Sequence, residues 1–347
     1  MRYAIWMATS FALLSAASCG GSEPSNGNTA GAGGTAGAGG SGGSGAGNAD
    51  ADTPDGSGTA EQACSETGNA LCSKIESCAP FAITAVFGDV ATCMSVAKAD
   101  CLGSLKATET AATPDTFLKC AADLKTAACP DILSNKTPPS CQPMGGTIGN
   151  GMACGDDWQC MSGRCAIPDN ATCGVCASLS AAGGPCPRST DNECENGLVC
   201  ADNLLCVAPG PAGVACDANH PCVSPNVCLG ATMTAQGTCA TGGALGDACA
   251  SDQACSILEG LWCTRATPRT CGTIGTVDPG MACGFLGVSS FALCKGGGSC
   301  VIATGMAMGI CPRLGLPGEA CSPTAACKAG ATCVNGLCTV REPASCR

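Results

Sequence analysis

Large aromatic side chains and charged residues are both scarce in this chain of 347 residues. Aromatic residues make up 3% of it and charged residues 12%, the latter about half the usual share. After residue 150 the aromatic residues are Trp158, Trp262, Phe285 and Phe291. Because large side chains supply much of the energy of a hydrophobic core, this part of the chain cannot depend on one conventional core.

Basic residues and histidine are also few. Sixteen Lys and Arg stand against 27 Asp and Glu, which gives a net charge of −11. Nucleic acid is therefore excluded as a partner, since its binding depends on basic groups that neutralise phosphates. The one histidine, His220, lies beside Pro221 and Cys222 in a predicted exposed loop. Because hydrolases and transferases need a poised acid, base or nucleophile, we expect no catalytic residues and no enzyme.

Cysteine is abundant, with 35 residues. A share of roughly a tenth is typical of disulfide scaffolds. Disulfides persist outside the cytosol and are reduced within it, and small domains without a large core are stabilised by such cross-links. The composition therefore predicts an exported, disulfide-rich protein.

The first 18 residues predict a secretory signal peptide. A basic start at residues 1–3 is followed by an apolar stretch at 4–14 and by small residues up to Ser18. The stretch is too short for a stable membrane-spanning helix. Cys19 after small residues resembles the lipobox of bacterial lipoproteins, from which Ala16 departs; the resemblance implies lipidation of Cys19. The alternative is ordinary cleavage near Ala17 or Ser18.

Gly20 directly follows the predicted lipidation site. In this position the chain resembles Gram-negative lipoproteins of the outer membrane. The localisation that we expect is the outer membrane or cell surface by lipid anchor, and otherwise secretion. Residues 19–58 are rich in Gly, Ser, Ala, Thr and Asn and predict a disordered tether with a reach of roughly 35 Å.

Matches to the dinucleotide fingerprint at 37–42 and the nucleophile elbow at 39–43 lack the flanking strand and helix that these motifs need.

Residues 59–143 predict a helical domain pinned by disulfides. Thr59 with Gln62 is a candidate capping box, Asp89 opens a second helix, and Thr113 with Pro114 opens a third. One face of each helix is apolar and holds cysteines, by a spacing of three, four and seven residues; in the third, this face runs from Phe117 to Ala128. The eight cysteines are Cys64, Cys72, Cys78, Cys93, Cys101, Cys120, Cys129 and Cys141, and they allow 105 pairings.

A repeat begins at residue 151. The pattern Gly-x-Ala-Cys starts at Gly151, Gly213, Gly246, Gly280 and Gly318, with a shortened copy at Gly184. A fixed period of this kind means an array of similar units. Six units of four cysteines are expected. Residues 151–206 hold nine cysteines for the first two units, namely Cys154, Cys160, Cys165, Cys173, Cys176, Cys186, Cys194, Cys200 and Cys206; the sets of the next four units are Cys216, Cys222, Cys228 and Cys239; Cys249, Cys255, Cys263 and Cys271; Cys283, Cys294, Cys300 and Cys311; and Cys321, Cys327, Cys333 and Cys338.

We expect two disulfides to stabilise each unit. The glycine before each first cysteine suits a turn with positive φ. Runs such as 197–200 and 335–338 predict short hairpins. The fold class is therefore small and disulfide-rich, with a helical N-terminal domain followed by tandem β-hairpin and loop modules. We expect two units in residues 151–206 and four more in 207–346, strung along the chain like beads.

Residues 151–206 resemble the Dickkopf N-terminal cysteine-rich domain. The matching frame is formed by Cys154, Cys160, Cys165, Cys173, Cys176, Cys186, Cys194, Cys200 and Cys206. The whole layout, with signal cysteine, tether, helical head and modules, resembles myxobacterial cysteine-rich lipoproteins. One departure is that the family has an adjacent cysteine pair where this chain has only Cys194. The resemblance implies the fold and not the receptor signalling of Dickkopf proteins.

Two cysteines remain when four are assigned to each of the six repeat units. Residues 151–206 hold nine cysteines, one more than two units need, and Cys346 follows the last unit. The two residues can bridge to each other, bridge to partners, or stay free. The sequence does not decide among these three outcomes.

Cofactor and metal chemistry are not expected. Cys173 and Cys176 have the spacing of a redox motif but lack its βαβ frame, and zinc needs reduced thiols. Acidic residues recur after the first cysteines, and we leave calcium open for them because it takes oxygen ligands. They are Asp156, Asp157, Asp191, Glu193, Asp217 and Asp252.

The composition and repeats favour a surface lipoprotein that acts as a non-catalytic binding or adhesion module. Stapled loops on a tether suit extracellular recognition. Its partner would be an extracellular protein or glycan, with membrane contact through the lipid anchor only. The alternatives are a structural spacer in a coat or matrix, and an inhibitor of proteases or other exoenzymes.

Overall fold

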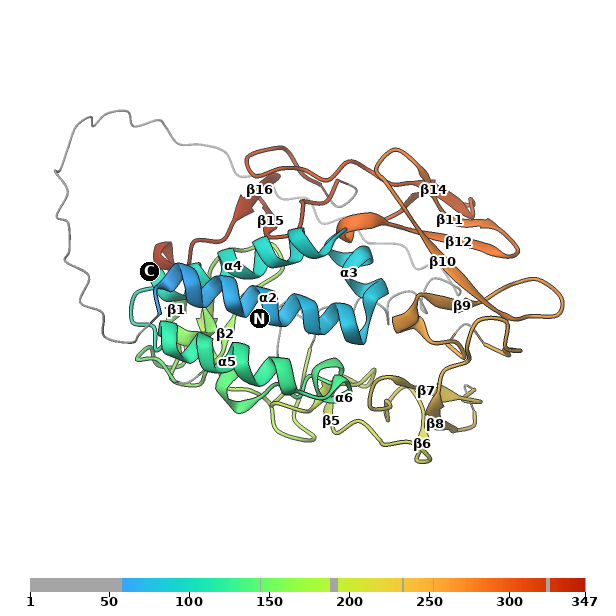
Figure 1. Cartoon of the computed structure of the whole chain (residues 1–347), viewed down its shortest axis with the longest axis horizontal. Helices are drawn as coiled ribbons and strands as arrows, with labels where there is room; N and C mark the ends of the chain where they lie inside the picture. The colour runs from blue at the N-terminus through green and yellow to red at the C-terminus, as the bar shows by residue number, and fades with distance from the viewer. Residues whose placement is uncertain are drawn as a thin grey trace, which may run out of the picture.

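The computed structural model describes residues 58–143, 145–187, 193–232, 234–251, 253–322 and 325–346. The predicted signal peptide, the lipidation site Cys19, the tether up to residue 57, Asp191 and Asp252 lie outside these residues. The described chain is disulfide-rich and consists of an N-terminal helical region followed by many short strands (Figure 1).

The helical region contains five α-helices and one 3-10 turn. They are α2 (Ala60–Cys78), α3 (Pro80–Val86), α4 (Val90–Lys106), α5 (Pro114–Thr126), α6 (Cys129–Leu133) and η2 (Pro139–Cys141). Within the described residues, no single helix is long and apolar enough to cross a membrane, and only α3 and α4 together, bent by 72° at their break, pass that test.

The three predicted helix starts are confirmed. The side chains of Thr59, Asp89 and Thr113 each accept a hydrogen bond from the backbone N–H three residues on, at 3.2, 2.7 and 3.2 Å. Each bond satisfies one of the N–H groups that a helix start leaves without an intrahelical partner. The Gln62 side chain is directed to Glu66 instead of completing a capping box with Thr59.

Two details of the helical prediction are wrong. Ala128 does not extend the buried face of α5, because that helix ends at Thr126 and Ala128 is exposed between α5 and α6. The short helix α3 was not predicted, although Pro80 stands at its tolerated first turn. Its apolar side chains Ile83 and Phe87 are buried with Leu71, Ile75 and Leu124 in the main core, so tertiary packing accounts for this helix.

Four disulfides join the helices. Cys64 and Cys72 of α2 are bonded to Cys101 and Cys93 of α4. On each helix the two cysteines are eight residues apart, which is a rise of about 12 Å. The first cysteine of α2 is bonded to the second of α4, and the second of α2 to the first of α4. The two helices are therefore antiparallel and held in register at two points. Cys78–Cys129 and Cys120–Cys141 attach α6 and η2.

The rest of the chain forms six cysteine modules, numbered 1 to 6 in chain order by the six sets of four cysteines. Their strands are β1 (Ala153–Cys154), β2 (Cys165–Ala166) and β3 (Gly174–Cys176) in module 1; β4 (Val199–Cys200) and β5 (Cys206–Val207) in module 2; β6 (Ala215–Cys216), β7 (Asn226–Leu229) and β8 (Gly237–Thr241) in module 3; β9 (Leu261–Cys263) and β10 (Cys271–Val277) in module 4; β11 (Ala282–Gly287), β12 (Ser290–Cys294), β13 (Val301–Ile302) and β14 (Met308–Ile310) in module 5; and β15 (Ala331–Val334) and β16 (Leu337–Val340) in module 6. Short 3-10 turns are η3 (Asp157–Gln159), η4 (Ile257–Glu259), η5 (Lys295–Gly297) and η6 (Pro343–Ser345).

One backbone pattern repeats in all six modules. The glycine three positions before the first cysteine has φ between 78° and 88°, and its N–H donates to the carbonyl of the fourth cysteine at 2.7–2.8 Å. The fourth cysteine's N–H in turn donates to the residue after that glycine at 2.8–3.0 Å. The glycines are Gly151, Gly183, Gly213, Gly246, Gly280 and Gly318. In module 2 the glycine with positive φ is thus Gly183, and not the Gly184 with which the sequence pattern was predicted to begin. A non-glycine residue is strained at such φ values, which explains why the repeat begins with glycine.

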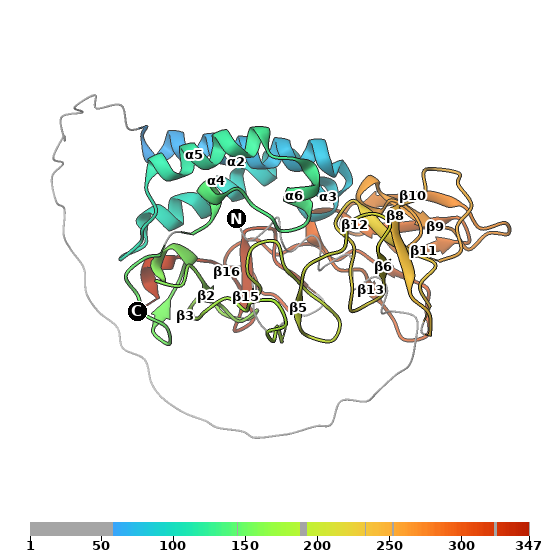
Figure 2. The same cartoon turned by 90° about the horizontal axis from the view of Figure 1, so that it is seen from below.

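The modules do not lie along the chain like beads, and that prediction is wrong. They form a ring (Figure 1), and the helices lie on one face of it (Figure 2). Cys173 of module 1 is bonded to Cys346 after module 6, so the ring is covalently closed. The last turn, η6, returns to α4, where Pro343 lies against Gly103.

Every module contacts the helical region. In module 1 the Trp158 ring packs 5.6 Å from that of Phe117. In modules 2 and 3 the backbone N–H groups of Gly197 and Ser224 donate to Asn135 and Ser134, both at 3.0 Å. Modules 4 and 6 place Leu258 and Ala329 against the main helical core, and in module 5 Gly296 and Gly297 lie against the backbone of Phe87 and Val86.

Modules 4 and 5 share one sheet, of strand order β13-β14-β11-β12-β10-β9. Strand β10 pairs in parallel with β12, so the hydrogen bonds cross from one module to the next. Trp262, Phe285 and Phe291 form a ring cluster with centroids 4.9–5.6 Å apart, and Arg265 lies 3.5 Å over the Phe285 ring. Three of the four aromatic residues of the modules therefore form one small core.

Candidate functional site

The disulfide framework is the feature that the sequence predicted most extensively. Seventeen disulfides join all the cysteines in the described residues. In each module the first cysteine is bonded to the third and the second to the fourth. The pairs are Cys154–Cys165 and Cys160–Cys176, Cys186–Cys200 and Cys194–Cys206, Cys216–Cys228 and Cys222–Cys239, Cys249–Cys263 and Cys255–Cys271, Cys283–Cys300 and Cys294–Cys311, and Cys321–Cys333 and Cys327–Cys338.

The two left-over cysteines are Cys173 and Cys346, and the structure bonds them to each other. Cys346 is thus not unpaired, although the sequence had left that outcome open. Cys173 and Cys176, which have the spacing of a redox motif, have different partners, since Cys176 is bonded to Cys160. A thiol–disulfide exchange centre needs its two cysteines to bond to each other, and these two do not.

Cysteine sulfurs gather closely enough to suggest metal sites, but their bonding argues otherwise. In several modules the sulfur atoms of three cysteines lie within 4.8 Å of one another, for example those of Cys154, Cys160 and Cys176. Zinc is held by deprotonated thiols. Because these sulfurs are in disulfides, the clusters are two neighbouring bridges rather than ligand sets.

The acidic pair of module 1 has structural partners. The Asp156 side chain is buried, accepts from the Trp158 N–H and from Ser104 Oγ, both at 3.0 Å, and caps η3. Asp157 accepts from the Cys165 N–H at 2.8 Å. The Ser104 bond ties module 1 to α4. Both carboxylates therefore accept protein hydrogen bonds that a calcium ion would have to displace.

Asp217 and His220 form a polar cluster in module 3. Asp217 Oδ1 lies 2.7 Å from His220 Nδ1 and accepts from the Asn219 N–H at 2.8 Å, while its Oδ2 accepts from the Gln236 side chain at 2.9 Å. The hydrogen bonds from Gln236 and His220 lower the pKa of Asp217 to about 2. The cluster closes a turn between β6 and β7 and leaves the His220 ring 63% exposed, in keeping with the predicted exposed loop.

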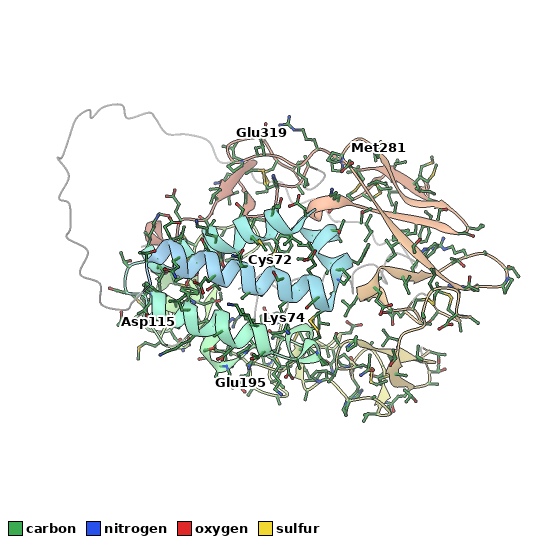
Figure 3. All side chains as sticks on the ribbon, viewed as in Figure 1. Cys72, Lys74, Asp115, Glu195, Met281 and Glu319 are labelled. Carbon is green, nitrogen blue, oxygen red and sulfur yellow. A yellow bond between two sulfur atoms is a disulfide. The ribbon has the colours of Figure 1, made fainter. Side chains whose placement is uncertain are left out.

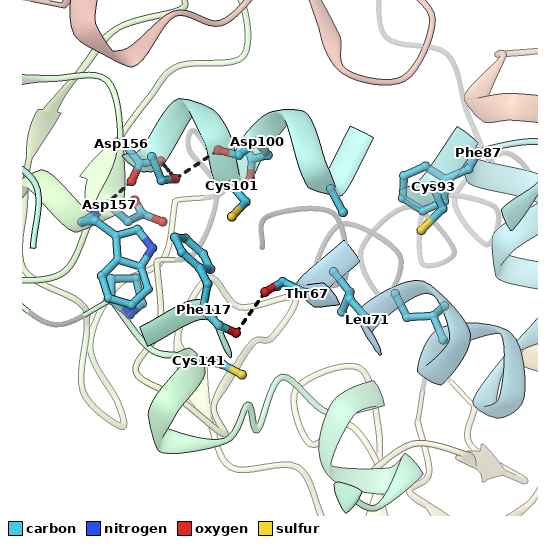
Figure 4. A pocket seen from close by; sticks show the side chains of 15 residues that line it. Thr67, Leu71, Phe87, Cys93, Asp100, Cys101, Phe117, Cys141, Asp156 and Asp157 are labelled. Atoms are coloured by element: carbon cyan, nitrogen blue, oxygen red, sulfur yellow. Dashed lines mark hydrogen bonds between the residues drawn. The ribbon is translucent and has the colours of Figure 1, made fainter. Parts of the chain in front are cut away.

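A small cavity lies between the helices and module 1. It has a volume of about 40 Å³ and is lined by residues that include Thr67, Leu71, Phe117, Asp156 and Trp158 (Figure 4). The Thr67 hydroxyl donates to the Phe117 carbonyl at 3.0 Å across it. One water molecule needs about 10–15 Å³ of such space, so the cavity suits a few water molecules and not an organic substrate.

A wider, open depression lies beside the ring closure. Its volume is about 450 Å³, and Thr172 of module 1 faces Leu337, Val340 and Glu342 of module 6 and its tail across it. Small-molecule sites are usually 300–1,000 Å³ and enclose their ligand. This depression reaches that size but is open, as a surface that receives a loop or an extended chain would be.

Comparisons with known proteins add no relative: no family model matches the chain, and neither a curated protein nor a solved structure matches it.

Proposed function

We propose that this protein is a surface lipoprotein that acts as a non-catalytic binding or adhesion module. The observation that supports the proposal best is the covalently closed ring, in which six stapled modules present their loops around a helical base. Loops on a rigid scaffold are the usual place for recognition residues. Rigid loops also lose little conformational freedom when they bind.

The disulfides support the proposed compartment. A chain with 34 cross-linked cysteines in its described part is typical of an oxidising environment. The proposed lipid on Cys19 would hold it at the outer membrane or cell surface, with residues 20–58 as the tether. Its partner would be an extracellular protein or glycan.

The depression at the ring closure is the proposed place of binding. Its two walls come from modules 1 and 6, which are far apart in the sequence and are joined by Cys173–Cys346. The module 6 wall includes strand β16, which pairs with β15 on one side and is hydrogen-bonded to residues 318–321 on the other. Its exposed side chains Leu337 and Val340 offer apolar contacts to a segment of a partner.

The ring argues for a binding platform over the alternative of a coat spacer. A spacer made of independent units tolerates the loss of one unit. Here each module contacts the helical region, and the Cys173–Cys346 bond closes the ring through all six modules. We expect deletion of residues 210–241, which contain module 3, to abolish binding, whereas a spacer would keep its function.

The inhibitor alternative is tested separately. A protease inhibitor of the stapled-loop type blocks its enzyme without being cut. We expect the mature protein to inhibit no secreted protease from its own source at micromolar concentration, when residual activity is measured on a fluorogenic casein substrate. Inhibition by the intact chain would favour the inhibitor function.

Modules 1 and 2 together are the part that we propose to be like the Dickkopf N-terminal domain. In each of these modules the first cysteine is bonded to the third and the second to the fourth. This pairing is the basis of the proposed likeness. Cys173 also belongs to the matching frame, but it is bonded outside the segment, to Cys346. The proposal extends to the fold of this segment and not to receptor signalling.

The experiment is partner capture by the whole exported chain in living cells. A photo-reactive amino acid is placed at Val340, in the depression, or at Leu245 in module 4 as a control. We expect a specific cross-linked protein or glycan from Val340 and none from Leu245. Cross-linking must be lost in the variant Cys173→Ala/Cys346→Ala; equal yields from both positions would contradict the proposal.

A further inference from the structure

Module 5 differs from the other modules in its surface. Eight of the 18 exposed large apolar side chains in the described residues lie between residues 281 and 310. They are Met281, Leu286, Val288, Val301, Ile302, Met306, Met308 and Ile310. Residues 279–312 contain a single charged residue, Lys295, although the chain has 43.

The exposed side chains of module 5 form a continuous surface. In β14, Met308 and Ile310 point to one face of the sheet, since side chains alternate along a strand. Ile310 is paired directly with Val301 of β13 and with Ala282 of β11, and directly opposed residues share a face. All four side chains are exposed, so this face of three strands is apolar and open to solvent.

Exposed apolar side chains of the β11–β12 hairpin and of the loop before β14 lie beside this face. The Phe285 N–H donates to the Ala307 carbonyl at 3.0 Å, so the loop with Met306 runs beside the strand that leads to Leu286. Val288 at the hairpin turn is 64% exposed and Met306 is 61% exposed. We name the set of Leu286, Val288, Val301, Met306, Met308 and Ile310 the apolar tip.

The charge of module 5 is directed away from the apolar tip. The side chain of Lys295 lies against Gly88, and its charge acts on Asp89 at the start of α4. Figures 1 and 2 place the sheet of this module at the end of the molecule opposite the start of α2. Figure 3 shows Met281 at the outer edge of the molecule, away from Cys72 at its centre.

We infer that the apolar tip docks on the lipid bilayer that holds the protein's own anchor. The inference rests on the proposed surface anchoring, and it goes beyond the expectation that the lipid alone touches the membrane. Exposed patches of this kind mark interaction sites. Interfacial binding scales with the apolar area that enters the lipid, and here no carboxylate within residues 279–312 has to be buried with it.

Lipid explains the tip better than a protein partner does. Cores of protein interfaces are enriched in aromatic residues, as well as in methionine and arginine, and have a polar rim. The exposed apolar tip consists of Val, Leu, Ile and Met, and the aromatic residues of its module, Phe285 and Phe291, are directed to Trp262.

The proposed tether supplies the second argument. A lipid on Cys19 would be separated from Gly58 by a segment of roughly 40 residues with a typical reach of about 35 Å. Such a link keeps the body at a high effective concentration near the membrane, so that a weak second contact is still made. Because the tether enters α2 at one end and the tip is at the other, the body would lie along the membrane.

The test uses the mature chain with Cys19→Ser, exported behind a conventional signal peptide, so that no lipid is attached. It is floated with vesicles of phosphatidylethanolamine and phosphatidylglycerol at a ratio of 3:1. We expect the chain to float, and Val288→Glu/Met306→Glu to reduce the vesicle-bound fraction by about tenfold or more. The matched control is Met161→Glu/Leu245→Glu, at side chains 66% and 64% exposed on modules 1 and 4, which should float as the parent does.

Folding of each variant is checked by the absence of free thiols. No flotation of the parent, or equal loss in the control, would overturn the inference. If the parent does not float but sediments as a dimer, and only the Val288→Glu/Met306→Glu variant sediments as a monomer, the apolar tip binds a second copy of the chain and not lipid. Because this chain carries no lipid and needs no partner, its result is independent of the cross-linking test of the binding function.

Discussion

Cys173 and Cys346 are bonded to each other although 173 residues separate them in the sequence. This one bridge joins module 1 to the end of the chain, and the Cys346 side chain is almost fully buried. It converts a row of modules into a ring around one face of the helices.

Opening the ring should loosen module 6 first. A disulfide contributes about 2–4 kcal/mol, mostly by restricting the unfolded chain. We expect Cys173→Ala/Cys346→Ala to lower the free energy of unfolding by about that amount and to speed hydrogen exchange in β15 and β16. The measurement is denaturant unfolding together with exchange mass spectrometry.

The matched control for ring opening is Cys216→Ala/Cys228→Ala, which removes a bridge within module 3. Its faster exchange should be confined to β6, β7 and β8. If the control loosens module 6 as much as ring opening does, the closure has no special role.

The thiol count is a second prediction. Since all described cysteines are in disulfides, Cys19 is the one remaining cysteine, and lipidation would block it. The protein from its native membrane, alkylated without reductant, should have the intact mass of a lipidated chain that starts at Cys19 with no alkyl group added. One alkyl group on an unlipidated chain would show a free Cys19 and refute the anchor, whereas several would contradict the disulfide framework.

Gly260 of module 4 lies in close contact with α3. Its φ is 74°, and a Cβ at this position would lie 2.6 Å from the Phe81 ring. We expect Gly260→Ala to lower the free energy of unfolding by about 2–4 kcal/mol, from backbone strain and overpacking together. The midpoint of denaturant unfolding measures it.

Gly246→Ala separates the two causes. Gly246 has φ of 88°, but a Cβ there would have no atom within 4 Å. Its substitution should cost about 1–2 kcal/mol through strain alone. Equal effects of the two substitutions would mean that the Phe81 contact contributes nothing.

The Asp217 cluster predicts a local response to acid. The pKa of Asp217 is lowered from 3.8 to about 2, so its hydrogen bonds stabilise the turn above pH 4 and are lost as the pH falls from about 4 to about 2. Gln236→Ala removes the largest cause and should raise this pKa toward 3.8. Carboxyl NMR titration measures the change.

Gln142→Ala is the control for this titration, because its side chain bonds to the Thr137 carbonyl in the helical region. It should leave the pKa of Asp217 unchanged. An unchanged value in Gln236→Ala would mean that the carboxylate does not accept that bond in solution.

Local rules were enough for the helix starts and the repeat. Capping by Thr59, Asp89 and Thr113 depends on neighbours within three residues, and the repeated glycine depends on the φ of one turn. The hairpin at Asn335 and Gly336 also follows from local chemistry, because both residues adopt the positive φ of a type I′ turn. Cysteine content likewise follows from composition alone and predicts the compartment.

The sequence by itself determined the starts of the three longest helices, the count of modules and the disulfide-rich class. Only the tertiary structure decided which cysteines pair, that Cys346 meets Cys173, and that the apolar residues of module 5 share one open face. The reason is physical. A cap or a turn is set by interactions within a few residues, whereas a disulfide between distant segments depends on how every intervening module packs on the helices, and many pairings satisfy the same local rules.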